Sequence, residues 1–428
     1  DYYSIGCMCA VDVGLPEYEG EFWDDISGKL LNKEGVIRAR QEEMKEFREH
    51  RVYVKVPIKE CYDVTGKAPV GVKWIDINKG DEANKEYSRL VAQEIKRDNR
   101  EDLFAATPPL EAKKLLFSLA ATEGVGYEEG RRHHGMKLDF IDIRKAFFHA
   151  DARREVYIEL PMEDHEEGKC GKLRKSFYGT RDAAQNWMEA YIKAMEDMGF
   201  TRGIASPCTF WHARRELRTV VHGDDFATLG YEEQLDWFKG EMAKRFECKH
   251  RGRIGPADKD EKEMRILNRI VTWTASGIQY EGDQRHVEIA MRHLGLDEGS
   301  REVGVPIVKD DEKGSIIELD KSAAKQYRGI IARMNYLGQD RSQIQFAVKE
   351  LSRAMAKPTE HDRGKLKKLV RFLKGCPRYI NHYSYQGRVE GIIVWTDADF
   401  AGCKKGRKST SGGIMQHGSH VIESWSTN

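Results

Sequence analysis

The feature that most constrains this chain is the stretch VVHGDDFATL, which runs from Val220 to Leu229. Two adjacent aspartates, Asp224 and Asp225, lie between two apolar runs of β-forming residues. This pattern predicts a tight hairpin with Gly223-Asp224 at its turn. Two carboxylates held so close together repel each other. A stable fold should avoid such a pair unless a cation binds there, so the sequence predicts a cation site at the hairpin tip.

A third carboxylate would complete a site for divalent cations. Asp139 and Asp142, in the β-rich run MKLDFIDIRKAFFH, are the candidates. Three carboxylates can hold two ions about 4 Å apart, as phosphoryl-transfer enzymes require, and Mg²⁺ suits them because it prefers hard oxygen ligands. An Asp-Asp pair also occurs in plain turns and in calcium loops. A calcium loop, however, needs more oxygens at fixed offsets than the following residues FATLG supply.

The composition is that of a globular chain with several domains. The 428 residues carry 71 basic and 70 acidic side chains, and this length favours two to four domains. No window approaches the roughly 18 apolar residues of a membrane span. The start lacks both an initiator Met and a signal pattern, so we expect a piece of a longer protein that is not secreted. The eight cysteines are scattered, with Cys7 and Cys9 as the close pair, which favours free thiols in a reducing compartment.

The hydrophobic periodicity predicts both helices and strands. Helices are expected at 34–50, from Thr107 as N-cap to Gly124, from Thr180 to Gly199, and within 321–356 and 359–375. Strands are expected in the runs VYVKVPI, VGVKWIDI, YSRLVAQEI, REVYIEL, NRIVTWT, SGIQYEG and GIIVWTDADFAG and on both sides of the aspartate pair.

Basic residues gather in four places although the net charge is only +1, namely Lys96–Arg100, Arg251–Arg253, Lys365–Lys374 and Lys404–Lys408. A basic cluster is more often a solvated face than a nucleic-acid contact, but local charge decides binding more than net charge does. The expected helix at 359–375 stands out, because bases cover most of its surface outside one apolar stripe and Asp362 is the single acid from His361 onward. We therefore hypothesise that this helix follows a phosphate backbone.

Several sequence blocks follow one another in a recognisable order. They are YSRLVAQEI at 87–95, IDIRKAFFHADARREVYIELP at 141–161, KLRKSFYGTRDAAQNW at 172–187, VVHGDDFATL, the helical segment 327–375, and WTDADFAGCKKGRKSTSGG at 395–413. Together these blocks resemble the reverse transcriptase of copia-type long-terminal-repeat retrotransposons, and the last one resembles the opening of that family's ribonuclease H domain. The resemblance covers the chain from about residue 50 onward and rests on the order of the blocks rather than on one motif.

The resemblance implies an RNA-directed DNA polymerase with an α+β, right-hand fold and an antiparallel palm sheet. Asp142, Asp224 and Asp225 would be its catalytic and metal-binding carboxylates, with two Mg²⁺ ions and Mn²⁺ as a substitute. The implied partners are an RNA template, a DNA primer and a deoxynucleoside triphosphate, without a membrane, and the implied locations are cytoplasmic virus-like particles and the nucleus. The expected domains are an N-terminal extension at 1–50, fingers at 51–135, palm at 136–245, thumb and connection at 246–390, and a truncated ribonuclease H-like segment at 391–428.

The same resemblance implies further residues that bind the substrate. Phe147 would lie under the sugar and exclude a 2′-hydroxyl, and Arg89 would reach the triphosphate. The turn at Tyr178 and Gly179 would approach the incoming nucleotide, and Arg181 would add a phosphate contact. The alternatives are a plain core side chain for Phe147 and plain surface residues for the two arginines.

The chain also departs from the family pattern. His222-Gly223 stands where the family usually has Tyr and a non-glycine residue, and we interpret His222 as a turn residue rather than a metal ligand. Asp182 stands where Gln is usual. Asp397 matches the first metal-binding aspartate of the ribonuclease H site without its later partners, so we expect no ribonuclease H activity from this chain. These departures leave a second hypothesis open, a non-catalytic, degenerate nucleic-acid-binding relic of such an element.

Overall fold

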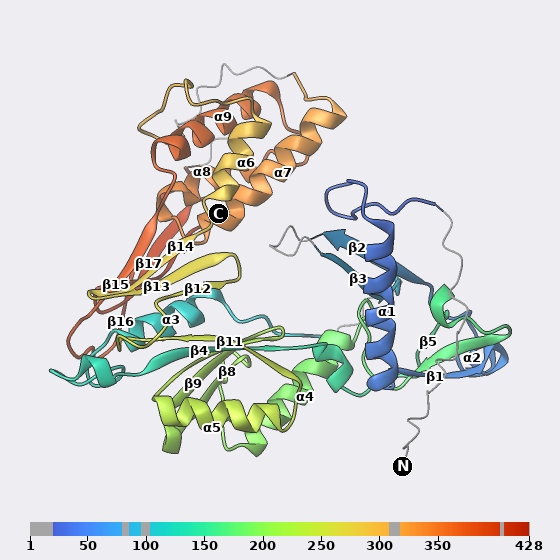
Figure 1. Ribbon diagram of the computed structural model, residues 1–428. Coiled ribbons are helices and arrows are strands. Elements are labelled where there is room, and N and C mark those ends of the chain that lie inside the picture. The colour runs from blue at the N-terminus through green and yellow to red at the C-terminus, as the bar shows by residue number, and fades with distance from the viewer. Residues whose placement is uncertain (1–19, 79–84, 96–102, 308–316, 403–405, 428) are drawn as a thin grey trace, which may run out of the picture. The chain divides into compact units, whose positions relative to one another are not determined.

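The computed structural model describes residues 20–78, 85–95, 103–307, 317–402 and 406–427 (Figure 1). The Cys7–Cys9 pair and the basic cluster Lys96–Arg100 lie outside the described residues, as does part of the cluster Lys404–Lys408.

The chain divides into two compact units that alternate along the sequence. The first unit comprises Asp1–Thr107, Ile143–Gly199 and Lys244–Glu247, and the second comprises Pro108–Asp142, Phe200–Ala243 and Cys248–Asn428. The boundaries expected for fingers, palm and thumb stay predictions.

The first unit packs helices against small antiparallel sheets. Its strands form one sheet in the order β1-β6-β5 and a separate hairpin of β2 with β3. Helix α1 begins at Lys33 because the side chain of Asn32 accepts a hydrogen bond from the backbone N–H of Gly35, at 2.8 Å. The elements are α1 (Lys33–Glu49), β1 (Tyr53–Pro57), α2 (Ile58–Thr65), β2 (Val72–Asn78), β3 (Glu86–Ala92), β5 (Tyr157–Ile158), β6 (Lys169–Leu173) and α4 (Ala183–Asp197), with short 3₁₀ helices at Ala146–His149 and Met162–Asp164.

The core of the first unit joins sequence blocks that lie far apart along the chain. Phe47 of α1 meets the ring edges of Phe148 and Phe177, with ring centroids 4.9 and 5.3 Å away. Leu90 of β3 is fully buried in the same cluster. The helix expected at 34–50 therefore serves as a packing surface for the segments expected to bind the substrate.

The second unit is built on a sheet with the strand order β11-β4-β10-β9-β8-β7. Helix α3 packs on one side of this sheet and α5 on the other (Figure 1). Phe117 of α3 joins Phe140, Ala227 and Leu229 of the sheet in one buried cluster. The elements are α3 (Leu110–Ala120), β4 (Lys137–Ile143), β7 (Thr201–Arg202), β8 (Thr209–His212), β9 (Leu217–His222), β10 (Asp225–Gly230), α5 (Glu232–Ala243) and β11 (Cys248–Ile254), with 3₁₀ helices at Arg132–His134 and Ala213–Arg215.

Helix α3 is shorter at both ends than the sequence pattern predicts. It begins at Leu110 rather than at Thr107, because a residue that precedes a proline is driven away from helical backbone angles and Pro108 precedes Pro109. It ends at Ala120 rather than near Gly124. Beyond that point the backbone N–H of Glu123 donates to the carbonyl of Gln386, at 3.0 Å, so a tertiary contact turns the chain away from the helix.

The remainder of the second unit consists of a helical cluster and two further sheets. The helices share one apolar core, and the break between α7 and α8 falls at Gln339–Arg341. The sheets have the orders β12-β13-β14-β15 and β16-β17-β18. The elements are β12 (Glu263–Ile266), β13 (Arg269–Thr274), β14 (Gly277–Gly282), α6 (Arg285–His293), α7 (Lys321–Gly338), α8 (Ser342–Ser352), α9 (Glu360–Gly375), β15 (Ile380–Ser384), β16 (Ile392–Ala398), β17 (Ser411–His417) and β18 (His420–Thr427).

The fold class is therefore the expected one, α+β with an antiparallel central sheet in which β4, β10, β9, β8 and β7 pair in antiparallel fashion. None of the helices within the described residues has both the length and the apolar character needed to cross a bilayer.

Candidate active site

Three aspartates meet at one end of the central sheet in the second unit. Strand β10 pairs with β4 so that Asp225 lies directly opposite Asp142, and Asp224 precedes Asp225 at the hairpin tip. One carboxylate oxygen from each of the three lies within 4.8 Å of the other two. The structure thus brings together Asp142, Asp224 and Asp225, as the sequence predicted, across 82 positions of chain (224 − 142).

Strand alternation explains why these carboxylates point the same way. Side chains two residues apart share a face of a strand, so Asp225 lies on the face that carries Ala227 and Leu229. Those two residues and Phe140 of β4 pack in the core cluster that contains α3. The middle of this sheet face is apolar and packs against α3, and the aspartates lie at one end of it.

The hairpin between β9 and β10 has a two-residue turn, as expected. His222 pairs with Asp225, which leaves Gly223 and Asp224 as the turn residues. Gly223 has a φ of +67°, and the first central position of such a turn favours glycine because other residues are strained at positive φ. The positive φ is a physical reason for glycine at position 223, where the family usually has a non-glycine residue.

The carboxylates of the cluster repel one another electrostatically. Burial raises the pKa of Asp225, and the neighbouring Asp224 and Asp142 raise it further, whereas Lys113 acts in the opposite direction. Repulsion within one site disfavours ionisation of all its members. A bound divalent cation would remove this cost. Three carboxylates also supply the hard oxygen donors that Mg²⁺ and Mn²⁺ prefer, so the residues fit such an ion.

His222 behaves as a turn residue beside the cluster. Burial, Lys113 and Arg269 lower its pKa to about 4, so it is neutral near pH 7. It is not among the residues whose ligand atoms converge with those of the three aspartates.

The sequence analysis did not predict that Lys113 of α3 lies beside the aspartate cluster. Its side chain is buried, its ammonium makes no hydrogen bond within the described part of the chain, and burial lowers its pKa to about 8. Together with Asp225 and Arg251 it lines a small cavity of about 40 Å³. A signal was present in the sequence, because Lys113 precedes Leu116, Phe117 and Ala120 at the spacing of one apolar helix face.

Asp139, the alternative third carboxylate, lies elsewhere. It is fully buried, and one of its oxygens accepts hydrogen bonds from Arg253, at 2.7 Å, and from His250, at 2.8 Å. It lies an odd number of residues from Asp142 and therefore on the other face of β4. Asp139 is thus part of a buried ion pair that joins β4 to β11.

Three of the expected substrate-binding residues form a cluster in the first unit. The ring of Phe147 packs against that of Tyr178 with centroids 4.7 Å apart, and the guanidinium of Arg89 lies 4.4 Å above the Tyr178 ring. Phe147 is half-buried, whereas its neighbour Phe148 is 1% exposed and belongs to the core. Phe148 is therefore a core side chain, and the role of Phe147 at the sugar stays a prediction.

The turn that follows Tyr178 is fixed by close backbone contact. Gly179 has a φ of +87°, and a Cβ atom there would lie 2.0 Å from the carbonyl oxygen of Ala92. The backbone N–H of Ala92 donates to the carbonyl of Tyr178, at 2.8 Å. Glycine is required at this position because β3 and the turn approach each other so closely.

Asp182, which replaces the usual Gln of the family, has an ionic partner. Arg154 donates to Asp182 at 2.5 Å and to both oxygens of Glu94 at 2.9 and 3.0 Å. Burial raises the pKa of Asp182, but the hydrogen bond from Arg154, its positive charge and a hydrogen bond from Asn186 together outweigh burial and leave the pKa lowered. The backbone N–H of Arg181 also donates to Glu94, at 2.8 Å. This network, rather than an amide side chain, holds the start of α4.

Comparison with known proteins shows which family the chain is similar to. Residues 60–256 match the family model described as reverse transcriptase (RNA-dependent DNA polymerase). The resemblance inferred from the sequence blocks is confirmed, because this model matches residues 60–256 and curated retrovirus-related Pol polyproteins from transposons match most of the chain.

Curated relatives of the chain include retrovirus-related Pol polyproteins from transposons of plants. The chain is 24% identical to the retrovirus-related Pol polyprotein from transposon TNT 1-94 of Nicotiana tabacum, over 92% of this chain and 29% of the relative. It is 25% identical to the corresponding polyprotein from transposon RE1 of Arabidopsis thaliana, over 84% of this chain and 24% of the relative. The chain thus spans less than a third of the length of these relatives.

Among solved structures, a foamy viral protease-reverse transcriptase in complex with double-stranded DNA is 12% identical with a TM-score of 0.47. That match covers 91% of this chain and 55% of the viral one.

Proposed function

We propose that this chain is an RNA-directed DNA polymerase that adds deoxynucleotides to a primer 3′-hydroxyl on an RNA or DNA template. The observation that carries the proposal is the pairing of Asp142 with Asp225 across β4 and β10, with Asp224 beside them. Three carboxylates that converge at a sheet end are costly to the fold, and their convergence suits a reaction that needs divalent cations.

In this proposal the three aspartates hold two Mg²⁺ ions. When bound, such ions stabilise the charge that develops on the attacking and leaving oxygens of an in-line displacement. Asp142 and Asp225, on paired strands of a rigid sheet, fix where the triphosphate and the primer end meet. The 3′-hydroxyl attacks the α-phosphate, and pyrophosphate leaves. Arg89 contacts the triphosphate, and Phe147 with Tyr178 contacts the sugar.

A primer-extension assay tests the proposal. Purified chain, a labelled DNA primer on poly(rA), dTTP and Mg²⁺ should yield extended primers. Failure to add any nucleotide with Mg²⁺, Mn²⁺ or another divalent metal would instead support the non-catalytic relic.

Replacing Phe147 with Val should weaken the discrimination against ribonucleotides. The smaller side chain leaves room for a 2′-hydroxyl, so the ratio of UTP to dTTP incorporation should rise by about tenfold or more, the usual worth of a steric contact in a pocket. The same substitution at Phe104, which is 62% exposed in the first unit, is the matched control. An unchanged ratio in Phe147→Val would remove the sugar contact from the proposal.

The basic helix α9 should contact the nucleic-acid backbone through Lys367 and Lys368. Its apolar stripe is buried as predicted, but Arg371 donates to the carbonyl of Arg301, at 2.5 Å, and Lys374 donates to that of Ser300, at 2.8 Å. These two side chains therefore bind the loop that contains Ser300 and Arg301. The prediction accordingly rests on Lys367 and Lys368.

Each phosphate neutralised contributes about 0.9 to the slope of log affinity against log salt. The double variant Lys367→Gln/Lys368→Gln should therefore flatten the slope for template–primer by roughly 1 to 2 units. Lys321→Gln/Lys325→Gln, at two exposed lysines of α7, is the control. Equal slopes in the two double variants would show that α9 is only a solvated face.

A further inference from the structure

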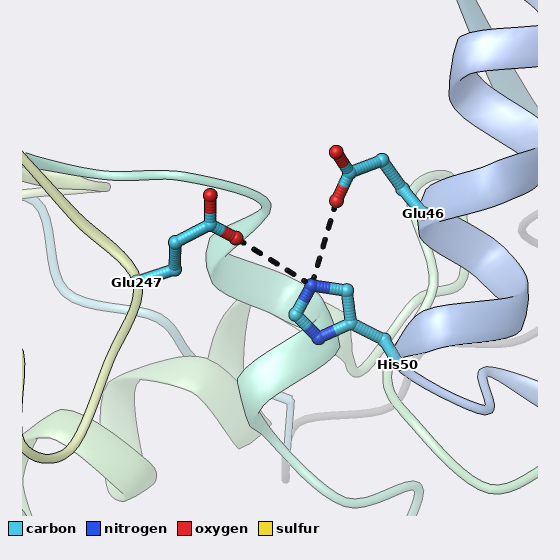
Figure 2. Close-up of side chains that lie close together, drawn as sticks. All are labelled: Glu46, His50 and Glu247. Carbon is cyan, nitrogen blue, oxygen red and sulfur yellow. Dashed lines mark ion pairs between the residues drawn. The ribbon is translucent and has the colours of Figure 1, made fainter. Parts of the chain in front are cut away.

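A second group of metal-binding side chains lies in the first unit. Glu46 and His50 lie four residues apart at the end of α1, and Glu247 comes from the short segment Lys244–Glu247. Figure 2 shows the three side chains directed toward one another. One ligand atom from each lies within 4.8 Å of the other two. Neither the resemblance nor the proposed polymerase reaction uses these residues.

The distances within this group are those of ligands around an ion rather than of hydrogen bonds. The Nε2 atom of His50 lies 3.6 Å from Oε2 of Glu46 and 3.8 Å from Oε2 of Glu247, and both separations exceed hydrogen-bonding distance. Tetrahedral Zn²⁺ binds nitrogen and oxygen at about 2.0–2.1 Å, which places neighbouring ligand atoms about 3.4 Å apart. Small side-chain movements would bring the three atoms to that spacing.

Arg144 orients the two glutamates from outside the group. Its guanidinium contacts Oε1 of Glu247, at 2.5 Å, and Oε1 of Glu46, at 3.5 Å. Its backbone N–H donates to the carbonyl of Glu247, at 2.9 Å. Each glutamate therefore presents its other oxygen, Oε2, to His50, and an outer partner that fixes ligand carboxylates in this way is a regular feature of metal sites.

Charge and access also suit a dication. Two glutamates and one arginine sum to a formal charge of −1 when His50 is neutral. The side chains of Glu46 and His50 are each 19% exposed and that of Glu247 is 39% exposed, so an ion and a water ligand can enter from solvent. An imidazole with two carboxylates favours Zn²⁺ over Mg²⁺, because Mg²⁺ takes oxygen ligands almost exclusively.

We propose that Glu46, His50 and Glu247 form a Zn²⁺ site, with water as the remaining ligand. The ion ties the end of α1 to the segment Lys244–Glu247. Its role is to hold these two segments together, so Zn²⁺ should stabilise the folded chain. The site is independent of the aspartate cluster and of polymerase activity.

Equilibrium binding and thermal unfolding of the full chain test this site. The background is the variant Cys7→Ser/Cys9→Ser/Asp224→Asn, which removes a thiol pair and a carboxylate that would compete for Zn²⁺ in the assay. This protein should bind one Zn²⁺ and melt at a higher temperature as the free Zn²⁺ concentration rises above Kd. His50→Gln and Glu247→Gln should each lower the affinity at least about tenfold and reduce the thermal shift at a given free Zn²⁺ concentration. Glu49→Gln, a neighbouring exposed glutamate, should change neither.

The absorption spectrum of the Co²⁺-loaded background protein provides a second readout. We expect no thiolate-to-metal charge-transfer band, because the proposed ligands are nitrogen and oxygen atoms. Glu247 is partly exposed outside the core, so Glu247→Gln should fold even if His50→Gln does not, and unfolding in chelator checks this. The site would be refuted if the background protein bound no Zn²⁺, if Glu247→Gln bound it as tightly as the background, or if Glu49→Gln were equally impaired.

Discussion

Replacing Asp225 with Asn should lower the rate of nucleotide addition by about a thousandfold. The carboxylate lies opposite Asp142 at the point where divalent cations are proposed to bind. Loss of several kcal/mol of transition-state stabilisation, at about a factor of ten per 1.36 kcal/mol, gives that magnitude. Asparagine has nearly the same shape, so β10 should keep its register.

The same substitution should not destabilise the fold. The pKa of Asp225 is raised by burial and by Asp224 and Asp142, which means that the ionised carboxylate costs folding free energy at pH values above the raised pKa. A neutral amide escapes this cost, so the melting temperature of the variant at pH 7 should equal or exceed that of the original chain. Lost activity with unchanged stability distinguishes a catalytic carboxylate from a structural one.

Single-turnover addition of dTMP to a primer on poly(rA) measures the effect. Glu233→Gln, at an exposed glutamate of α5, is the charge-matched control and should retain activity. Activity of Asp225→Asn within tenfold of the original would exclude Asp225 from the reaction.

The hairpin could be predicted from sequence because its determinants are local. Two apolar β runs, a glycine and a two-residue turn place Asp224 and Asp225 at the tip without help from the rest of the fold. The third carboxylate could not be chosen in this way. Asp139 and Asp142 belong to the same strand and point to opposite faces, so the choice depends on the register between β4 and β10, which pairs Asp142 with Asp225 and Asp139 with Thr228.

Features that depend on tertiary packing escaped the sequence patterns. The pairing of Arg154 with Asp182 offsets a departure from the family pattern, yet 28 residues separate the two. Glu247 joins Glu46 and His50 only because a four-residue segment of the chain returns to the first unit. No local periodicity encodes such contacts. The fold class and the aspartate pair at the hairpin tip were therefore predictable, the third aspartate followed from the family resemblance, and the surrounding ion pairs required the structure.

Replacing Asp340 with Ala should be the most destabilising single change among the ion pairs of the second unit. Asp340 lies between α7 and α8 with its side chain 2% exposed. One oxygen lies 2.6 Å from Nε of Arg269 and the other 3.2 Å from Nζ of Lys114, both of which are also buried. Removing the carboxylate leaves two cations without their counterion in a dry interior, so the free energy of unfolding should fall by about 3–5 kcal/mol.

Urea denaturation followed by tryptophan fluorescence measures this loss. The control is Asp258→Ala, at an exposed aspartate, whose free energy of unfolding should stay within about 0.5 kcal/mol of the original.

A triple variant tests whether the unpaired cations cause the loss of stability. If the stranded cations are responsible, the triple variant Lys114→Met/Arg269→Met/Asp340→Leu should recover much of the lost stability, because apolar side chains of similar volume often replace a buried ion pair at little cost. If the triple variant were as unstable as Asp340→Ala, the lost free energy would come from the packing between α7 and α8. If Asp340→Ala were as stable as Asp258→Ala, the buried ion pair would not stabilise the second unit.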